Sequence, residues 1–132
     1  MMNSMKIDAV AVSSSDLKQT LAFYTCLGFE FADLEEGQQH VEPKTSPGSA
    51  RLMIDSQELM QDIIGEQARP GNHSSFAIRF EQPDQVNQAC ERVVQSGFTV
   101  VKEPWDAFWG QRYAIVEDPD GYRIDLYCPL DS

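Results

Sequence analysis

Short stretches in which apolar and polar residues alternate are separated by stretches with helical periodicity, and this order occurs twice along the chain. In the first half, residues 6–12 alternate with the period of two that is typical of a strand. Residues 16–27 carry apolar side chains at helical spacing, after a Ser-rich segment that supplies N-cap chemistry. Gly28 stands where a left-handed residue commonly ends a helix. The pattern predicts a strand, a helix and then further strands.

The second half repeats this order. Residues 74–80 alternate, Pro83 opens a helical stretch, and Gly97 closes it. The strands predicted over the whole chain are residues 6–12, 29–34, 39–44, 50–54, 74–80, 98–101, 112–117 and 122–127. A duplication of this kind matters because one unit exposes a sheet face that its copy can cover.

The length and this repeat favour a single domain over residues 1–132. We expect a first module over about 6–56, a linker over about 57–72 with at most a short helix, and a second module over about 73–128.

The charge balance limits the partners of the protein. Ten Lys and Arg residues stand against 21 Asp and Glu residues, a formal net charge of -11. Because nucleic acid and anionic membranes are polyanions, this balance argues against both as partners. The N-terminal residues contain no apolar run long enough for a signal peptide or a membrane span. Cys26, Cys90 and Cys128 are widely spaced, which predicts buried thiols in a reducing compartment and a cytoplasmic location.

Two segments carry a resemblance to a known family. "LAFYTCLGFEF" in the first half and "EPWDAFWGQRYAIVEDPDGYRIDLY" in the second resemble the vicinal oxygen chelate superfamily, over about residues 6–128. That group includes glyoxalase I, extradiol dioxygenases and the bleomycin resistance proteins. The resemblance implies an α+β fold of two tandem βαβββ modules, which form an incomplete eight-stranded barrel around a cavity. It also implies a homodimer, because the family commonly builds its cavity across a two-fold interface.

The same resemblance implies four metal-ligand positions, on the first and last strands of each module. In the first module they fall on Ala9, which cannot ligate, and near Met53, whose thioether is a soft donor. In the second they fall on His73, or its neighbours Ser74 and Ser75, and on Asp125, where the metalloenzymes carry Glu.

An Asp is shorter than a Glu by one carbon–carbon bond, about 1.5 Å, whereas metal–ligand distances vary by only about 0.2 Å. We therefore expect no cofactor. If a divalent metal does bind, His73 and Asp125 are the residues that would hold it. A shifted alignment would bring in Asp8 or Asp55 instead.

Other residues could contact a ligand directly. In "YRIDLY", Asp125 and Tyr127 share one face of a strand, and the resemblance implies that this face lines the cavity. The segment 103–113 concentrates Trp105, Phe108, Trp109 and Tyr113 in a predicted loop that leads into a strand. These aromatic side chains form either a lid or a wall for an apolar ligand.

Charged and titratable residues offer further contacts. In the same loop, Arg112 could pair with an anionic group. His73 lies either exposed at a strand start or in the pocket as an acid or base. His40 is expected in a solvated loop or an edge strand, and Asp118–Gly121 in a type I turn.

Three functions remain open from the sequence. The first is metal-independent binding of a small aromatic or cationic molecule, with Met53, Trp105 and Tyr127 among the contacts. The second is a metal-dependent lyase or dioxygenase of the glyoxalase type. The third is a metal-free enzyme in which His73 or Asp125 acts as general acid or base.

Overall fold

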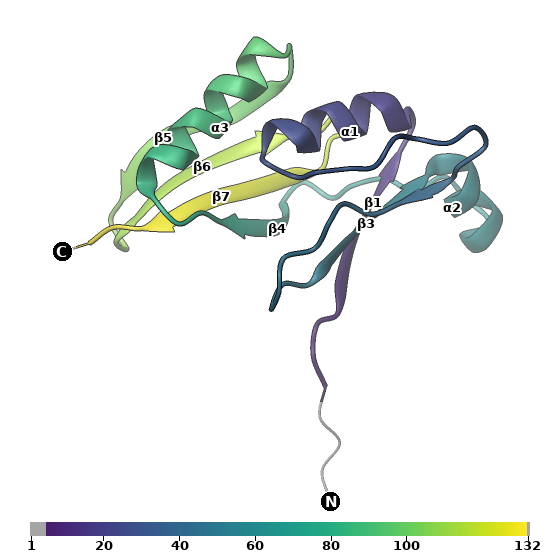
Figure 1. The fold of residues 1–132 in the computed structure, drawn as a ribbon, viewed down its shortest axis with the longest axis horizontal. Coiled ribbons are helices and arrows are strands. Elements are labelled where there is room, and N and C mark those ends of the chain that lie inside the picture. The colour runs from purple at the N-terminus through teal and green to yellow at the C-terminus, as the bar shows by residue number, and fades with distance from the viewer. Residues whose placement is uncertain (1–4, 132) are drawn as a thin grey trace, which may run out of the picture.

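The computed structural model describes residues 5–131, which contain strands and helices from both halves of the chain (Figure 1). In chain order these elements are β1 (Ala9–Ser14), α1 (Leu17–Cys26), β2 (His40–Val41), β3 (Arg51–Ser56), α2 (Gln57–Ile64), β4 (Ser74–Arg79), α3 (Pro83–Gln95), β5 (Thr99–Ala107), β6 (Gln111–Glu117) and β7 (Arg123–Pro129).

The strands form two sheets, one from each half of the chain. The 3-stranded sheet has the order β1-β3-β2, with β1 and β3 parallel. The 4-stranded sheet has the order β4-β7-β6-β5, with β4 parallel to β7 and the other pairs antiparallel. Among residues 5–131 both sheets are open and no closed barrel is present. The α+β class is confirmed.

The helices cover one side of this arrangement. Figure 1 shows α3 lying across the four-stranded sheet, with α1 beside it toward the three-stranded sheet and α2 at the far end of the latter. The core lies beneath α1 and α3, where Phe23, Val86, Ile124 and Leu126 are fully buried. Burying each such side chain contributes roughly 1.5–3 kcal/mol.

The helix boundaries follow the predicted capping residues. The side chain of Asp16 accepts a hydrogen bond from the Gln19 amide at 3.4 Å at the start of α1. Gly28, just past the end of that helix, has a φ of +111°, which favours glycine. Pro83 is the first residue of α3, where its missing N–H costs nothing.

The predicted strand over residues 29–34 is wrong. A single backbone hydrogen bond, from the Lys44 amide to the Glu30 carbonyl at 2.9 Å, joins this segment to its neighbour. Pro43, next to Lys44, has no N–H group and cannot extend a ladder. Phe29 and Phe31 nevertheless pack against the core. Their alternation therefore reflects packing of an irregular segment rather than strand pairing.

The predicted turn at Asp118–Gly121 is confirmed and is tied to the first helix. The Gly121 amide donates to the Asp118 carbonyl at 3.0 Å. The Asp118 carboxylate, only 3% exposed, accepts from the Tyr24 hydroxyl at 2.8 Å and from the amides of Asp120 and Tyr122. Burial raises the pKa of Asp118 to about 6. The turn thus joins α1 to the sheet of the second half.

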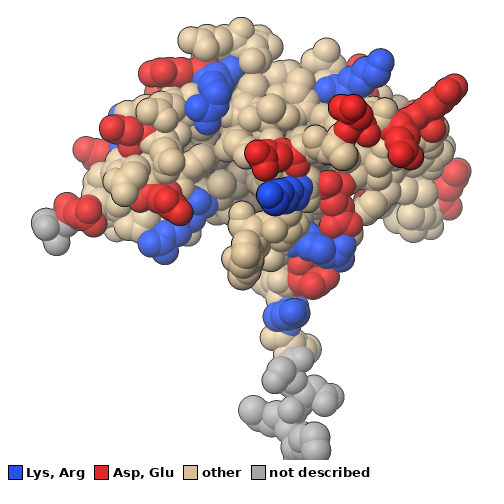
Figure 2. All heavy atoms as spheres, in the orientation of Figure 1, with Lys and Arg blue, Asp and Glu red and all other residues tan. Residues whose placement is uncertain are grey.

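The charged side chains on the surface and the state of the three cysteines are as expected from the sequence. Figure 2 shows acidic side chains spread over the visible face, with Lys and Arg side chains among them. Cys26, Cys90 and Cys128 are free and buried, as predicted. No helix within residues 5–131 is both long and apolar enough to cross a bilayer.

Candidate functional site

Asp125 lies on the face of the four-stranded sheet that the helices leave open. Its neighbours along β7, Ile124 and Leu126, are fully buried on the opposite face, as the alternation predicted. In the strand register Asp125 stands between Ala77 of β4 and Ile115 of β6. This places the carboxylate in the middle of the sheet rather than at its edge.

Two hydroxyl groups hold the Asp125 carboxylate. The Ser74 hydroxyl donates to Oδ1, and the Tyr113 hydroxyl donates to Oδ2 at 2.5 Å. Burial and the neighbouring Asp125 carboxylate together raise the pKa of Tyr113 to about 12. Tyr113 therefore remains a hydrogen-bond donor at neutral pH. Each carboxylate oxygen keeps one further acceptor position for a ligand.

An aromatic cluster borders this carboxylate. The rings of Trp105 and Tyr113 meet edge to face with centroids 5.5 Å apart, as do those of Trp109 and Tyr113. Tyr113 stacks on Tyr127 at 6.0 Å. The Lys102 ammonium already lies 5.0 Å from the centroid of the Trp105 ring. The open face thus combines a carboxylate with aromatic rings that accept a cation.

The segment predicted as an aromatic loop is mostly strand. Trp105 belongs to β5, and only residues 108–110 form the turn to β6. Phe108 is 96% exposed in that turn and contacts Trp109, with centroids 5.0 Å apart. The predicted loop was wrong because β5 pairs with β6 through two register shifts, which let the strand continue past Pro104.

Arg112 lies on the opposite face of the sheet from Asp125. Its guanidinium donates to Asn87 of α3 at 3.0 Å and to Asp106 at 3.1 Å. Arg112 has the same parity along β6 as the buried Ala114 and therefore points toward the helices. The structure does not bring Arg112 together with Asp125 and the rings of Trp105, Trp109, Tyr113 and Tyr127, which we call the open-face cluster.

His73 and Met53 also lie outside the cluster. The His73 ring is exposed, and its Nδ1–H donates to the Ser74 carbonyl at 2.9 Å. Met53 lies on β3 of the other sheet, opposite Ala11. Of the predicted residues, the structure gathers Asp125, Trp105, Trp109, Tyr113 and Tyr127 on one face, together with Ser74, the alternative to His73.

A second polar cluster lies on the three-stranded sheet. His40, in the edge strand β2, contacts Asp55 through Nδ1 at 2.5 Å and Glu42 through Nε2 at 2.8 Å. These hydrogen bonds, first to Glu42 and then to Asp55, raise the pKa of His40. Arg51 donates to Glu42 at 2.8 Å and to Asp8 at 3.0 Å. The edge-strand prediction for His40 is confirmed, but its side chain is paired rather than free.

The donors that residues 5–131 bring together do not fit a divalent metal of the type that the resemblance implies. Within residues 5–131, no group of three or more His, Cys, Asp or Glu side chains could hold an ion. The two carboxylates around His40 bind opposite ring nitrogens and therefore do not converge on one point. The Asp125 carboxylate contacts two hydroxyl groups. The other ligand positions that the resemblance implies fall on Ala9 and Met53, which provide no hard donor for the ion.

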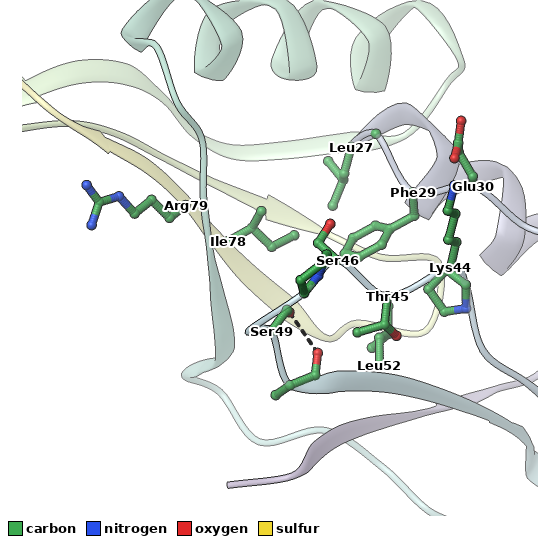
Figure 3. A pocket seen from close by; sticks show the side chains of 14 residues that line it. Leu27, Phe29, Glu30, Lys44, Thr45, Ser46, Ser49, Leu52, Ile78 and Arg79 are labelled. Atoms are coloured by element: carbon green, nitrogen blue, oxygen red, sulfur yellow. Dashed lines mark hydrogen bonds between the residues drawn. The ribbon is translucent and has the colours of Figure 1, made fainter. Parts of the chain in front are cut away.

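A separate cavity of about 430 Å³ lies where the two halves of the chain meet (Figure 3). Figure 3 shows Phe29, Leu52 and Ile78 turned toward this hollow, whereas the guanidinium of Arg79 points away from it. The residues of the open-face cluster do not line it. Its lining also includes exposed polar side chains, among them Glu30, Lys44, Thr45 and Ser46, so it is a mixed polar and apolar cavity that is separate from Asp125.

The sequence placed Ser74 beside His73 as an alternative ligand position and Tyr113 in the aromatic segment, but it predicted no hydrogen bond from either hydroxyl to Asp125. A local signal existed for Tyr113, which has the opposite parity to the buried Ala114 and Val116 on β6. No local signal existed for Ser74. Its approach to Asp125 depends on the register shift between Ser74 and Phe76, where β4 pairs with β7.

Comparisons with known proteins agree with this fold. The chain is 30% identical over 126 residues to a lactoylglutathione lyase of Salmonella typhimurium, covering 89% of this chain and 87% of the relative. A glyoxalase-related enzyme from Fulvimarina pelagi superposes with a TM-score of 0.79 at 18% identity, covering 95% of this chain and 88% of the other.

A lactoylglutathione lyase from Agrobacterium tumefaciens has a TM-score of 0.68 at 18% identity and covers 96% of each chain. At these identities the solved structures establish the fold. Residues 6–126 match the model of the Glyoxalase/Bleomycin resistance protein/Dioxygenase superfamily, and the chain belongs to that family.

Proposed function

We propose that this protein binds a small aromatic molecule carrying a hydrogen-bond donor on the open face of its four-stranded sheet, without a divalent metal. The observation that carries this proposal is the arrangement at Asp125, whose two oxygens accept from Ser74 and Tyr113. The hydroxyl groups fix the carboxylate in place, and its remaining acceptor positions face the open side of the sheet. A ligand ammonium or hydroxyl would take those positions.

The aromatic cluster supplies the second part of the proposed site. Trp105, Tyr113 and Tyr127 present rings at edge-to-face and stacked geometries, which a further ring can extend. A ligand cation gains from these rings as well as from the carboxylate, since cation–π contacts contribute about 0.5–2 kcal/mol. An aromatic ammonium ion therefore combines both interactions.

Binding of three molecules of similar size tests this proposal: benzylammonium, phenol and benzoate, followed by calorimetry and thermal shift. We expect benzylammonium to bind best and benzoate worst. Asp125→Asn should weaken benzylammonium binding by roughly tenfold or more, because a charged hydrogen bond is lost. Trp105→Ala should weaken all three ligands, whereas the control Asp62→Asn on the exposed side of α2 should change none.

Equal affinity for benzoate and benzylammonium, or unchanged binding by Asp125→Asn, would show that the carboxylate does not select the ligand. If Trp105→Ala binds all three molecules as the parent protein does, the aromatic wall is not part of the site.

A homodimer is part of the same proposal. In one chain the open faces of both sheets are uncovered, and Phe108 and Trp109 at the tip of the β5–β6 hairpin are 96% and 49% exposed. A second copy would cover these faces and enclose the ligand. Sedimentation velocity should give the mass of a dimer, and Phe108→Ser should shift the population toward monomer. A monomer at every protein concentration would exclude the dimer.

A lyase is the second candidate function, favoured by the 30% identity to a lactoylglutathione lyase over most of both chains. The donors at Asp125 argue against a metal-dependent reaction of that kind in this protein. Formation of lactoylglutathione by the purified protein supplied with Ni²⁺ would favour this candidate over the binding function.

A further inference from the structure

Arg79 lies on the same open face of the four-stranded sheet as Asp125. On β4, Phe76 and Ile78 pack against the core, so Ala77 and Arg79 point to the opposite side of the sheet. Figure 3 shows the Arg79 guanidinium directed away from the cavity that Ile78 lines. The open face therefore carries a cation beside the open-face cluster.

The strand register places Arg79 at the end of a row of aromatic residues. From β4 to β5, the residues paired in this row are Arg79, Tyr127, Tyr113 and Trp105. Asp125 lies two residues before Tyr127 on β7, diagonally across from Arg79. Because strands lie about 4.8 Å apart and rise about 3.3 Å per residue, the Cα atoms of Arg79 and Asp125 are roughly 8 Å apart. A ligand ring that lies on Tyr127 can therefore present one group to each of these two side chains.

The guanidinium of Arg79 is available to a ligand. Within residues 5–131 it forms no ion pair, and the Asp125 carboxylate is bound by two hydroxyl groups instead. The Lys102 ammonium, by contrast, already lies 5.0 Å from the centroid of the Trp105 ring. A planar guanidinium binds a carboxylate through two parallel hydrogen bonds. A ligand carboxylate is therefore the partner that suits Arg79.

The open face differs in charge from the chain as a whole. Ten Lys and Arg residues stand against 21 Asp and Glu residues in the chain. On the open face, the strand register sets three cations, Arg79, Lys102 and Arg123, against two carboxylates, Glu117 and Asp125. Arg123 and Glu117 lie 3.9 Å apart and largely offset each other. Two cations and one carboxylate are left, so the local charge of this face favours an anionic group although the protein is acidic.

From this arrangement we infer that Arg79 selects ligands that carry a carboxylate in addition to the aromatic ring and the hydrogen-bond donor. The ligand class is then a hydroxy- or aminomethyl-substituted aromatic acid, which rests on the proposed function because Asp125 and the rings are shared. The donor would bind Asp125, the ring would lie on Tyr127, and the carboxylate would accept from Arg79. Benzoate has the carboxylate but no donor for Asp125, so it stays the weakest of the three molecules proposed above.

Calorimetry with two matched pairs of probes tests this role of Arg79: phenol against para-hydroxybenzoate, and benzylammonium against para-(aminomethyl)benzoate. In the parent protein the carboxylate should strengthen binding about threefold to tenfold within each pair, as expected for one partly exposed ion pair. Arg79→Gln should abolish this gain. Arg79→Lys should keep part of it, because the charge remains without the planar fork. The matched control Arg69→Gln, in the connection between α2 and β4, should keep the full gain.

Equal affinities within both pairs, or a gain that survives Arg79→Gln, would overturn this role of Arg79. Because phenol and benzylammonium lack the carboxylate, their binding tests the proposed function alone. If they bind and the carboxylate adds nothing, the proposed function stands and only the role of Arg79 is excluded. If none of the four probes binds, both are wrong.

Discussion

Asp118→Ala should lower the free energy of unfolding by about 3 kcal/mol at neutral pH. The substitution removes the acceptor for the Tyr24 hydroxyl and for two backbone amides in the turn. Tyr24 is fully buried, so its hydroxyl would be left without a partner in the core. Urea unfolding followed by circular dichroism measures the change.

Asp118→Asn is the matched control, because its carbonyl oxygen can still accept from the two amides while the buried charge is removed. We expect this variant to be close to the parent protein in stability at neutral pH. Equal losses for Asp118→Ala and Asp118→Asn would mean that the charge, rather than the set of hydrogen bonds, stabilises the turn. An Asp118→Ala protein as stable as its parent would exclude the turn as a structural link.

Because the pKa of Asp118 is raised in the folded protein, the contribution of this residue to the free energy of unfolding depends on pH. Burial brings this pKa to about 6 from the ordinary value of 3.8, so the folded protein binds the proton more tightly than the unfolded chain. The proton-linked part of the contribution of Asp118 to stability is then fully present below pH 4 and is lost as the pH rises through 6, which leaves the part that comes from its hydrogen bonds. The difference in unfolding free energy between the parent and Asp118→Asn should follow this direction, and a difference independent of pH would contradict it.

The sequence predicted the fold well where the signals are local. The alternation around Asp125, the helix end at Gly28 and the turn at Asp118 each depend on residues within one element or turn. Prediction failed where the outcome depends on a distant partner. Residues 29–34 alternate like a strand, yet the neighbouring Pro43 cannot extend a ladder with them.

In the candidate site, too, the features set by local pattern were predictable and those set by strand pairing were not. Tyr113 and Arg112 are adjacent in β6, and strand parity alone separates Tyr113 on the open face from Arg112 on the helix face. The resemblance placed Ser74, as an alternative to His73, at one site with Asp125, but local pattern could not predict their hydrogen bond, which depends on the register shift where β4 pairs with β7. His40 likewise acquires Asp55 as its partner only through the pairing of β2 with β3.

We expect the purified protein to hold no divalent metal of the family type, and this result is all or none. Asp125 is held by two hydroxyl groups, and within residues 5–131 no three metal-binding side chains converge. Ala9 and Met53 offer no hard donor to complete a site, even if a second copy brought the two sheets together. A divalent ion would therefore lack the ligands that it needs.

Elemental analysis tests most directly whether the residues around Asp125 form a metal centre. The purified protein is incubated with Ni²⁺, Mn²⁺, Fe²⁺ or Zn²⁺, and excess ion is removed before the measurement. We expect far less than one metal ion per chain, with the same metal content in the parent protein and in the Asp125→Ala, His73→Ala double variant. One metal ion per chain in the parent protein, lost in that double variant, would contradict it.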